Sequence, residues 1–219
     1  MTTTSREDYL KQVFVLQQGR KDAVPMGELA SAMDVAPASA TGMVKSLTDR
    51  GLLHYEPYVG VSLTPNGERA ALDVIRRHRL IEAFLVQTLG LDWSEVHEEA
   101  ERLEHAVSEK LLDRIDKFLG TPAVDPHGDP IPGARGRMST RSRKNLYQHR
   151  PGDRVRVVRV IDQDRKFLRF IDRIGLRPGT QVTVESSDPE AQVLHVRSGE
   201  GKSIALAASA AQKLLVEPG

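Results

Sequence analysis

Residues 26–64, MGELASAMDVAPASATGMVKSLTDRGLLHYEPYVGVSLT, decide the fold class of this chain. Helix-forming residues on either side of a Pro37 turn predict two short helices, and Gly51 ends the second of them. Alternating apolar residues then predict a small hairpin through Gly60. The predicted elements are Met26–Met33, Ala38–Arg50, Leu52–Tyr58 and Val61–Thr64. Helix, tight turn, helix and β-hairpin in this order are typical of a winged helix-turn-helix.

The second helix of this motif has an apolar face and a small polar face. The residues predicted to pack inward are Val35, Met43, Val44 and Leu47. The residues predicted to face DNA are Pro37, Ala38, Ser39, Thr41 and Lys45, with Tyr58 at the hairpin tip. Small side chains allow close approach to a major groove, and a helix N-terminus favours phosphate. The alternative is a winged helix that makes only protein contacts.

Two further helices are predicted beside the motif, over residues 5–20 and 66–89. Ser5 is the expected N-cap of the first, with Asp8 at the capping-box position. Asp8 has a second possible role, because its carboxylate can instead point toward a metal-binding face. The later helix carries His78 and Glu82 one turn apart, so these side chains share a face.

The stretch His97–His105, HEEAERLEH, lacks glycine and proline and predicts part of a continuous helix from Ser94 to about Leu119. A helical wheel places an apolar stripe on one side, made of Val96, Ala100, Leu103, Val107 and Leu111. The flank beside the stripe carries His97, Glu101, Glu104 and His105. Imidazoles and carboxylates on a half-buried face suit a divalent metal such as Mn, Fe, Co or Zn. The alternative is a solvated acidic helix.

The chain changes character after Thr121. Prolines and glycines mark a linker up to Gly152, and the part from Pro130 onward has no acidic residue. Its basic side chains, expected to contact phosphates or to be solvated, are Arg135, Arg137, Arg141, Arg143, Lys144 and Arg150. Four strands then follow around a helix at Lys166–Ile174, over residues 154–160, 181–185, 193–196 and 203–206. Short strands with frequent turns predict a small barrel.

Composition narrows the class of protein. The 219 residues carry a formal net charge of +1, so any basic surface must be local. The sequence has no cysteine, which excludes thiolate metal sites and fits the cytoplasm. No apolar run approaches the ~20 residues of a membrane span. The apolar stripes of residues 70–89 and 96–115 exceed what one subunit covers, which predicts a homodimer.

Several long motifs resemble one known family, the metal-dependent repressors that include the diphtheria toxin repressor and the manganese transport regulator. They are RRHRLIE at 76–82, GLDWSEVHEEAERLEH at 90–105, DPHGDPIPG at 125–133 and an IGLRPG turn at 174–179. The resemblance implies an α+β fold with a winged helix-turn-helix domain at 1–72 and a helical metal-binding and dimerisation domain at 73–122. It also implies a basic linker at 123–152 and an SH3-like (FeoA-type) domain at 153–219.

The same resemblance implies the metal ligands. The primary site would be formed by Asp8, Glu101, Glu104 and His105. A secondary site would be formed by His78, Glu82 and His97, with Asp164 as a candidate from the SH3-like domain. Asp125 and His127 resemble a linker pair that some members use beside Glu82. Short manganese-responsive members carry Glu three residues after the first Asp, whereas this chain has Lys11, which argues against a closely bridged two-metal centre.

The function implied is a metal-dependent DNA-binding regulator of metal homeostasis genes, acting as a homodimer on a palindromic operator. Iron-responsive members tend to carry Met and Cys where Asp8 and Glu101 stand, so these hard carboxylates favour Mn(II), with Fe(II) as the alternative. Two less favoured classes are a metal-independent winged-helix dimer and a metal hydrolase. The hydrolase motif H-E-x-x-H is absent, because the His after His97-Glu98 comes eight residues beyond His97, and we expect no enzyme.

Overall fold

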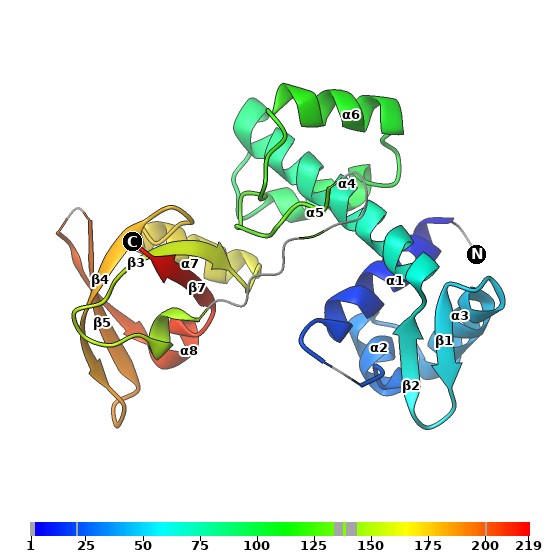
Figure 1. Cartoon of the computed structure of the whole chain (residues 1–219), viewed down its shortest axis with the longest axis horizontal. Helices are drawn as coiled ribbons and strands as arrows, with labels where there is room; N and C mark the ends of the chain where they lie inside the picture. The colour runs from blue at the N-terminus through cyan, green and yellow to red at the C-terminus, as the bar shows by residue number, and fades with distance from the viewer. Residues whose placement is uncertain (1–2, 21, 134–137, 139–143, 200) are drawn as a thin grey trace. The chain divides into compact units, whose positions relative to one another are not determined.

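The computed structural model describes residues 3–20, 22–133, 138, 144–199 and 201–219, without the side chains of residues 3 and 4 (Figure 1). These residues form two compact units. The first contains the chain up to His78 together with Glu104–Val107, and the second contains Arg79–Leu103, Ser108–Ile131 and the chain from Met138 onward. Four arginines of the predicted basic arm, Arg135, Arg137, Arg141 and Arg143, lie outside the described residues.

The first unit is a winged helix-turn-helix, as the sequence predicts. Its elements are α1 (Thr3–Gln17), α2 (Met26–Ala32), α3 (Pro37–Asp49), β1 (Leu53–Glu56), β2 (Gly60–Leu63) and the first half of α4 (Pro65–Leu89). Helix α1 begins before Ser5, so Ser5 lies inside the helix and the predicted cap is wrong. With no cap to complete, Asp8 is available for a tertiary contact.

The apolar positions of these elements meet in one core. The residues that are buried in it include Leu10, Val13, Leu29, Met43, Val44, Leu47, Leu53 and Val61. Strands β1 and β2 pair antiparallel, and Val24 adds a bridge to Val61 beside them. Gly60 is required there, because a Cβ would lie 2.4 Å from the Val24 carbonyl oxygen. Val35 is 37% exposed rather than packed inward, because Asp34 before it adopts a left-handed turn with φ of 51°.

The helical part of the second unit corrects one prediction. The helix that the sequence predicts from Ser94 to about Leu119 is two helices, α5 (Val96–Leu103) and α6 (Glu109–Phe118). Residues 104–106 form a turn between them. Ser108 begins the second helix, since its side chain accepts a hydrogen bond from the Leu111 amide at 3.3 Å. Glu104 and His105 therefore lie in a turn and not on the flank of a helix.

The C-terminal part of the second unit is a small antiparallel sheet domain. Its elements are a 3-10 turn (Leu146–Gln148), β3 (Arg154–Val160), α7 (Arg165–Ile174), β4 (Gln181–Asp188), β5 (Val193–Ser198), β6 (Ser203–Ala207), α8 (Ala208–Ala211) and β7 (Leu214–Pro218). The strand order is β6-β5-β4-β3-β7, with bulges in β3 and β4 that bend the sheet. Strand β7 and α8 are not predicted from the sequence, because Leu214–Val216 shows no alternation of apolar and polar residues.

Alternation and capping explain this domain. Val155, Val157 and Val160 of β3 face a core with Leu168 and Ile171 of α7, while Arg154 and Arg156 are exposed. Helix α7 starts at Asp164, whose carboxylate accepts from the amides of Lys166 and Phe167 at 2.9 and 3.2 Å. No helix among the described residues combines the length and the apolar character that crossing a membrane requires.

Candidate metal centres and DNA-binding surface

The first candidate centre lies in the first unit and is called the Glu104 cluster. It consists of Asp8 on α1 and of Glu104 and His105 in the turn after α5, and each offers one ligand atom within 4.8 Å of the others. The Nε2 atom of His105 lies 2.9 Å from Oδ1 of Asp8 and 3.4 Å from Oε1 of Glu104. Three of the four predicted primary ligands are thus brought together, although Asp8 is nearly 100 residues away from the other two in sequence.

Glu104 is the centre of this cluster and is fully buried. Its Oε2 lies 2.5 Å from Nδ1 of His78, and its Oε1 accepts a hydrogen bond from the Lys11 ammonium at 2.7 Å. Burial alone would raise the pKa of Glu104, but the hydrogen bond and charge of His78, with the charge of Lys11, hold this pKa below its ordinary value. The protein therefore keeps a buried carboxylate ionised by surrounding it with its own cations.

Glu7 is a member of the surroundings that the sequence did not predict. Its carboxylate lies 2.7 Å from Nδ1 of His105 and 3.5 Å from Nη1 of Arg77. A carboxylate on one ring nitrogen orients the imidazole, so the Nε2 atom of His105 faces Asp8 and Glu104. The sequence indicated Glu7 only as an acidic residue next to Asp8, which is a predicted ligand.

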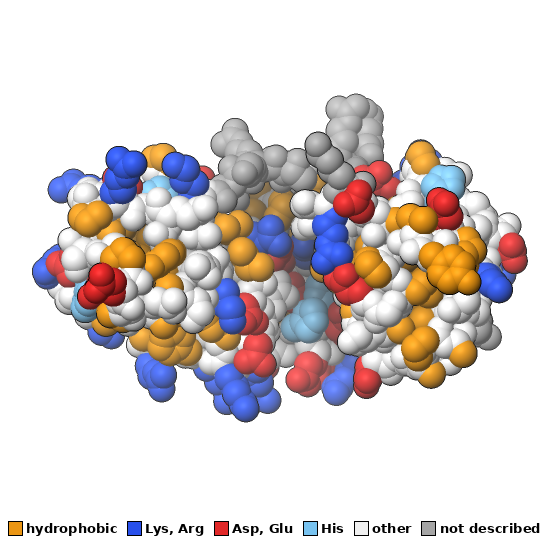
Figure 2. All heavy atoms as spheres, turned by 90° about the horizontal axis from the view of Figure 1, so that it is seen from below, with side chains coloured by type: hydrophobic (Ala, Val, Ile, Leu, Met, Phe, Trp, Pro, Cys, Tyr) orange, Lys and Arg blue, Asp and Glu red, His pale blue; other side chains and the backbone are white. Residues whose placement is uncertain are grey.

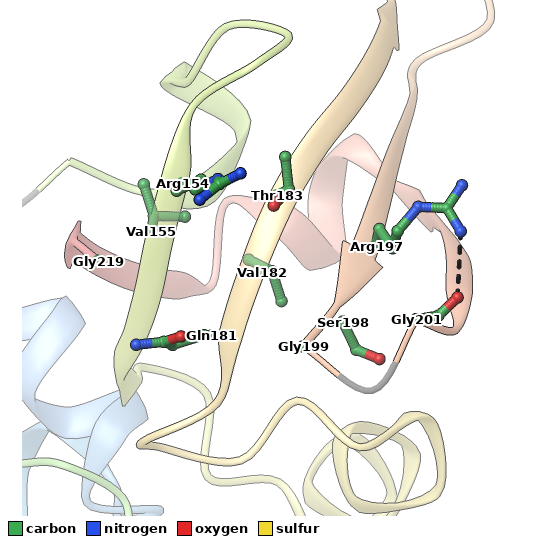
Figure 3. A pocket seen from close by; sticks show the side chains of 10 residues that line it. All are labelled: Arg154, Val155, Gln181, Val182, Thr183, Arg197, Ser198, Gly199, Gly201 and Gly219. Carbon is green, nitrogen blue, oxygen red and sulfur yellow. Dashed lines mark hydrogen bonds between the residues drawn. The ribbon is translucent and has the colours of Figure 1, made fainter.

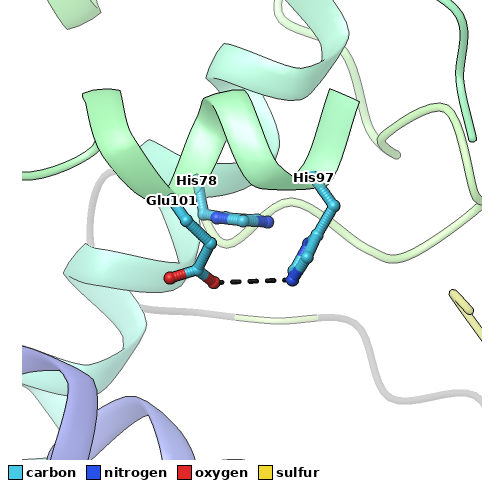
Figure 4. Close-up of side chains that lie close together, drawn as sticks. All are labelled: His78, His97 and Glu101. Carbon is cyan, nitrogen blue, oxygen red and sulfur yellow. Dashed lines mark ion pairs between the residues drawn. The ribbon is translucent and has the colours of Figure 1, made fainter. Parts of the chain in front are cut away.

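The other two predicted ligands of the 97–105 stretch belong to α5. His97 and Glu101 are one turn apart, and their ion pair measures 3.6 Å from Nε2 to Oε1; Figure 4 draws this pair together with His78 of α4. The Nδ1 atom of His97 lies 3.3 Å from Oε1 of Glu82. The pairing of His97 with Glu82 agrees with the predicted secondary set, whereas the bond that His78 makes is to Glu104.

The second candidate centre lies wholly in the second unit and is called the His127 cluster. It consists of Glu82 on α4 and of Asp125 and His127 in the segment after α6, again with ligand atoms within 4.8 Å of one another. All three side chains are buried. Oδ1 of Asp125 accepts from the amides of His127 and Asp129 at 2.8 and 2.9 Å, which fixes the carboxylate in a tight turn.

Some buried atoms of the His127 cluster have no hydrogen-bond partner among the described residues. They include Oδ2 of Asp125, which lies 3.7 Å from Nε of Arg79, and Nδ1 of His127, which lies 3.7 Å from Oε2 of Glu82. Burial, together with the charges of Asp129 and Glu82, raises the pKa of Asp125 to about 7. Burial would lower the pKa of His127, but the nearby carboxylates of Glu82 and Asp125 raise it overall. Buried polar atoms are normally satisfied, so this arrangement fits a cation.

The donor atoms of both clusters fit a divalent metal ion. Carboxylate oxygen with imidazole nitrogen is a ligand set for Mn, Fe, Co or Zn, and the absence of cysteine excludes thiolate ligation. Asp164 is a different case, because its Oδ1 already caps α7. Its predicted role as a ligand gains no support from this position.

Comparisons with known proteins show which family the chain belongs to. Residues 1–61 match the model of the iron dependent repressor N-terminal DNA binding domain, residues 64–133 its metal binding and dimerisation domain, and residues 144–218 the FeoA domain. An iron-dependent repressor IdeR of Mycobacterium leprae is 31% identical over 206 residues, which cover 88% of each chain. The chain belongs to the iron-dependent repressor family.

Two further members show the range of the iron-dependent repressor family. The HTH-type transcriptional regulator MntR of Lysinibacillus sphaericus is 37% identical over 126 residues, covering 58% of this chain and 89% of that protein. A solved structure described as a manganese-dependent transcriptional repressor in complex with manganese has 40% identity and a TM-score of 0.88, covering 98% of this chain and all of that one. Members of this family are metal-dependent transcriptional repressors that bind DNA and dimerise.

The second helix of the helix-turn-helix, α3, presents an outward face. Pro37, Ala38, Ser39 and Lys45 are exposed, and the hydroxyl of Thr41 donates to the Pro37 carbonyl at 2.8 Å. No side chain caps the start of α3 at Ala36, so its first amides remain available to a phosphate. Tyr58 at the wing tip is fully exposed, with a left-handed φ of 67°.

Charge is mixed on the face of this repressor-family chain that Figure 2 shows. Basic and acidic side chains are interspersed there, and hydrophobic patches lie between them. A pocket at one end of the C-terminal sheet is lined by Arg154, Gln181 and Arg197, among others (Figure 3). The Arg197 guanidinium already donates to the Gly201 carbonyl at 3.1 Å and pairs with Glu185. This pocket offers no buried charged group, in contrast to the two clusters.

Proposed function

We propose that this protein is a manganese-responsive transcriptional repressor that binds a palindromic operator of metal homeostasis genes as a homodimer. The observation that carries the proposal is the Glu104 cluster, in which a hard carboxylate of α1 meets Glu104 and His105 from a distant turn. Membership of the family supports a metal-dependent regulator, and two oxygen donors with one imidazole favour Mn(II) over softer ions. Fe(II) is the alternative, because IdeR relatives are iron-dependent by name.

The ligands of the primary site would be Asp8, Glu104 and His105, three of the four that the family resemblance implies. Bound there, a divalent cation supplies positive charge that the carboxylates share. Asp8 would then be held to Glu104 and His105, and Glu7 would keep the His105 ring in the required orientation. Lys11 occupies one oxygen of Glu104 as a built-in cation, which supports a single metal ion at this site.

Restraint of α1 bears on DNA binding because α1 and the recognition helix α3 share one core. Leu10 and Val13 of α1 are buried in the same cluster as Met43, Val44 and Leu47 of α3. A cation that binds better when α1 is held shifts the population toward the DNA-competent state by that difference in affinity. Two recognition helices of a dimer would then reach successive major grooves, ~34–36 Å apart.

A second metal site is proposed at the His127 cluster. Glu82, Asp125 and His127 would be its ligands, and His97 would stand beside Glu82. The buried Asp125 and His127 atoms without hydrogen-bond partners support it. This assignment shares Glu82, with His97 beside it, with the predicted secondary set, whereas the Asp164 carboxylate caps α7.

Exposed apolar side chains support the homodimer. Leu89, Leu103, Leu111 and Phe118 are 38–70% exposed, all in the helical part of the second unit. Apolar groups of this size at the surface mark an interface, and a second copy of the chain is the partner that the family's dimerisation domain favours. We infer no catalytic activity, and action on chromosomal operators would place the protein in the cytoplasm.

The proposal is tested by selecting an operator duplex from random DNA and measuring its binding to metal-free protein by fluorescence anisotropy. Mn(II), anaerobic Fe(II), Co(II) and Zn(II) are added separately. We expect a gain of about 5–150-fold in affinity with Mn(II), the usual range of allosteric coupling. Equal binding with and without every metal would overturn metal control, and a response to Fe(II) alone would favour the iron alternative.

The DNA-binding surface has its own test. Lys45→Ala removes one exposed charge from α3, so binding should weaken on every sequence. The slope of log affinity against log salt should fall in magnitude by about one. Asp49→Asn, at the far end of the same helix, is the control. An unchanged slope in Lys45→Ala would remove Lys45 from the interface.

A further inference from the structure

The loop that carries Asp125 and His127 is held by the C-terminal domain. The loop closes on itself through a bridge between Val124 and Pro130. The amide of Val160 at the end of β3 donates to the carbonyl of His127 at 2.9 Å. Gly128 packs so closely on β3 that a Cβ would lie 1.9 Å from the Val158 carbonyl oxygen, and its φ is 87°.

Asp129 ties this loop to three other segments. Its carboxylate is only 2% exposed and accepts from Nη2 of Arg79 on α4 at 3.2 Å, from Nε2 of Gln163 at 2.8 Å and from the Arg159 guanidinium of β3. Arg79 also donates to the Pro130 carbonyl at 2.6 Å. A single buried carboxylate thus links the metal-ligand loop to the helix of Glu82 and to the C-terminal sheet.

Trp93 supports His127 directly. Its ring stacks on the His127 imidazole, with centroids 5.5 Å apart, and its carbonyl lies 2.7 Å from Nε2 of His127. A carbonyl only accepts, so this bond places a proton on Nε2 and leaves Nδ1 as the ring nitrogen that faces Glu82. The indole belongs to the core of the C-terminal domain, and the Arg177 guanidinium lies 5.0 Å from its ring centroid.

We propose that Asp129 and Trp93 are positioning residues that couple cation binding at the His127 cluster to the packing of the C-terminal sheet domain against the Asp125–Pro130 loop. The inference rests on the proposed second metal site. Glu82 comes from α4, whereas the two other ligands come from a loop bonded to β3. A cation held by both sides strengthens the packing, and by reciprocity, loss of the packing weakens the cation site.

Trp93 is the only tryptophan in the sequence, so its fluorescence reports on this site. The full-length protein is titrated with Mn(II), a paramagnetic quencher, and bound Mn(II) is counted in parallel by the loss of the free-ion electron paramagnetic resonance signal. Hydrogen exchange of the 157–161 segment, which includes the Val160 amide, reports the packing. Glu82→Gln removes a ligand without touching Trp93 and defines the part of each signal that belongs to the His127 cluster.

The variants that test the coupling leave the ligands in place. Asp129→Asn removes the shared charge, and Arg159→Gln removes one of its partners from the β3 side in case the first variant folds poorly. We expect Mn(II) affinity at this site to fall about tenfold to a hundredfold in Asp129→Asn, with quenching displaced equally, and less in Arg159→Gln. Trp93→Leu should weaken Mn(II) binding, and Trp93→Phe should restore it. Asp162→Asn, whose carboxylate pairs with Lys213, is the matched control.

The outcomes separate the coupling from the site. If Glu82→Gln binds as many Mn(II) ions as the wild type, the second metal site is wrong and the coupling falls with it. If Glu82→Gln loses one ion but Asp129→Asn and Arg159→Gln bind Mn(II) with wild-type affinity, the site stands and the coupling is overturned. Slower exchange of the 157–161 segment on adding Mn(II), lost in Glu82→Gln, would support the coupling.

Discussion

The Glu104 cluster and the His127 cluster contain the same donor types in opposite surroundings. Glu104 is buried, yet Lys11 and His78 contact its oxygens, while Asp8 is 30% exposed at its side chain. In the His127 cluster all three side chains are sealed from solvent, and some of the ligand atoms have no hydrogen-bond partner among the described residues. The first cluster is partly neutralised by the protein and open to exchange, which suits a sensor. The second is enclosed, and Arg79 comes no nearer than 3.7 Å to Oδ2 of Asp125, which suits a structural ion.

The largest expected effect is that of a substitution at Gly128, beside the His127 cluster. Gly128→Ala forces a side chain against the Val158 carbonyl at a left-handed φ of 87°. We expect a loss of about 3 kcal/mol in the free energy of unfolding of the second unit, with loss of Mn(II) binding at the His127 cluster only. Urea denaturation with and without Mn(II) measures this.

The control for that prediction is Gly120→Ala. Gly120 has a similar φ of 73° but nothing within 4 Å of its added Cβ. Backbone strain alone should cost about 1 kcal/mol there. Equal losses in the two variants would mean that the loop is not packed on β3 as described.

Lys11 tests whether the protein's own positive charge competes with a metal ion for Glu104. Lys11→Gln leaves Oε1 of Glu104 without its ammonium, so the metal-free protein should lose about 1–3 kcal/mol of stability. Mn(II) should bind more tightly to this variant, because no internal cation competes for that oxygen. Denaturation in chelator and calorimetric Mn(II) titration measure the two effects, with the exposed Lys110→Gln as control. Unchanged Mn(II) affinity would show that Lys11 does not compete.

Asp92 serves as a reference carboxylate, outside both clusters, that is stabilised mainly by hydrogen bonds. The side chain and amide of Ser94, which donate to it at 2.5 and 2.8 Å, hold the pKa of Asp92 below its ordinary value. Because solvent screens this exposed carboxylate, its contribution is at most about 0.5 kcal/mol. It is present above the ordinary aspartate pKa of about 4 and is lost as pH falls through the lowered value. Wild type and Asp92→Asn should therefore differ in urea stability at pH 6 and converge toward pH 2. A constant difference would exclude titration of Asp92.

Local sequence predicted the elements well where local signals decide them. The helix-turn-helix, the hairpin and α7 follow from caps, glycines and alternation. The break after Leu103 was missed because residues 104–107 contain adequate helix formers, and the burial of Glu104 against α1 and α4 decides the turn. Strand β7 was missed because Leu214, Leu215 and Val216 are all apolar, so the sequence shows no alternation there.

The residues of the candidate sites also divide into those that the sequence predicted and those that it did not. Asp8, Glu104 and His105 were predicted from helix spacing together with a family resemblance, and the structure brings them together. Glu7 and Asp129 act through contacts between distant segments, so no spacing in the sequence indicates them. The grouping of Asp125 and His127 with Glu82 was implied by the family resemblance and not by spacing, because it depends on how the segment after α6 packs on α4.

The central claim is that Mn(II) at the Glu104 cluster controls DNA binding. The most direct measurement is operator affinity against Mn(II) concentration for Glu104→Gln, with Glu98→Gln, an exposed acid of α5, as the matched control. The account predicts that Glu104→Gln stays a folded dimer and loses the Mn(II)-dependent gain in affinity, while Glu98→Gln keeps it. A wild-type response to Mn(II) in Glu104→Gln would contradict the account.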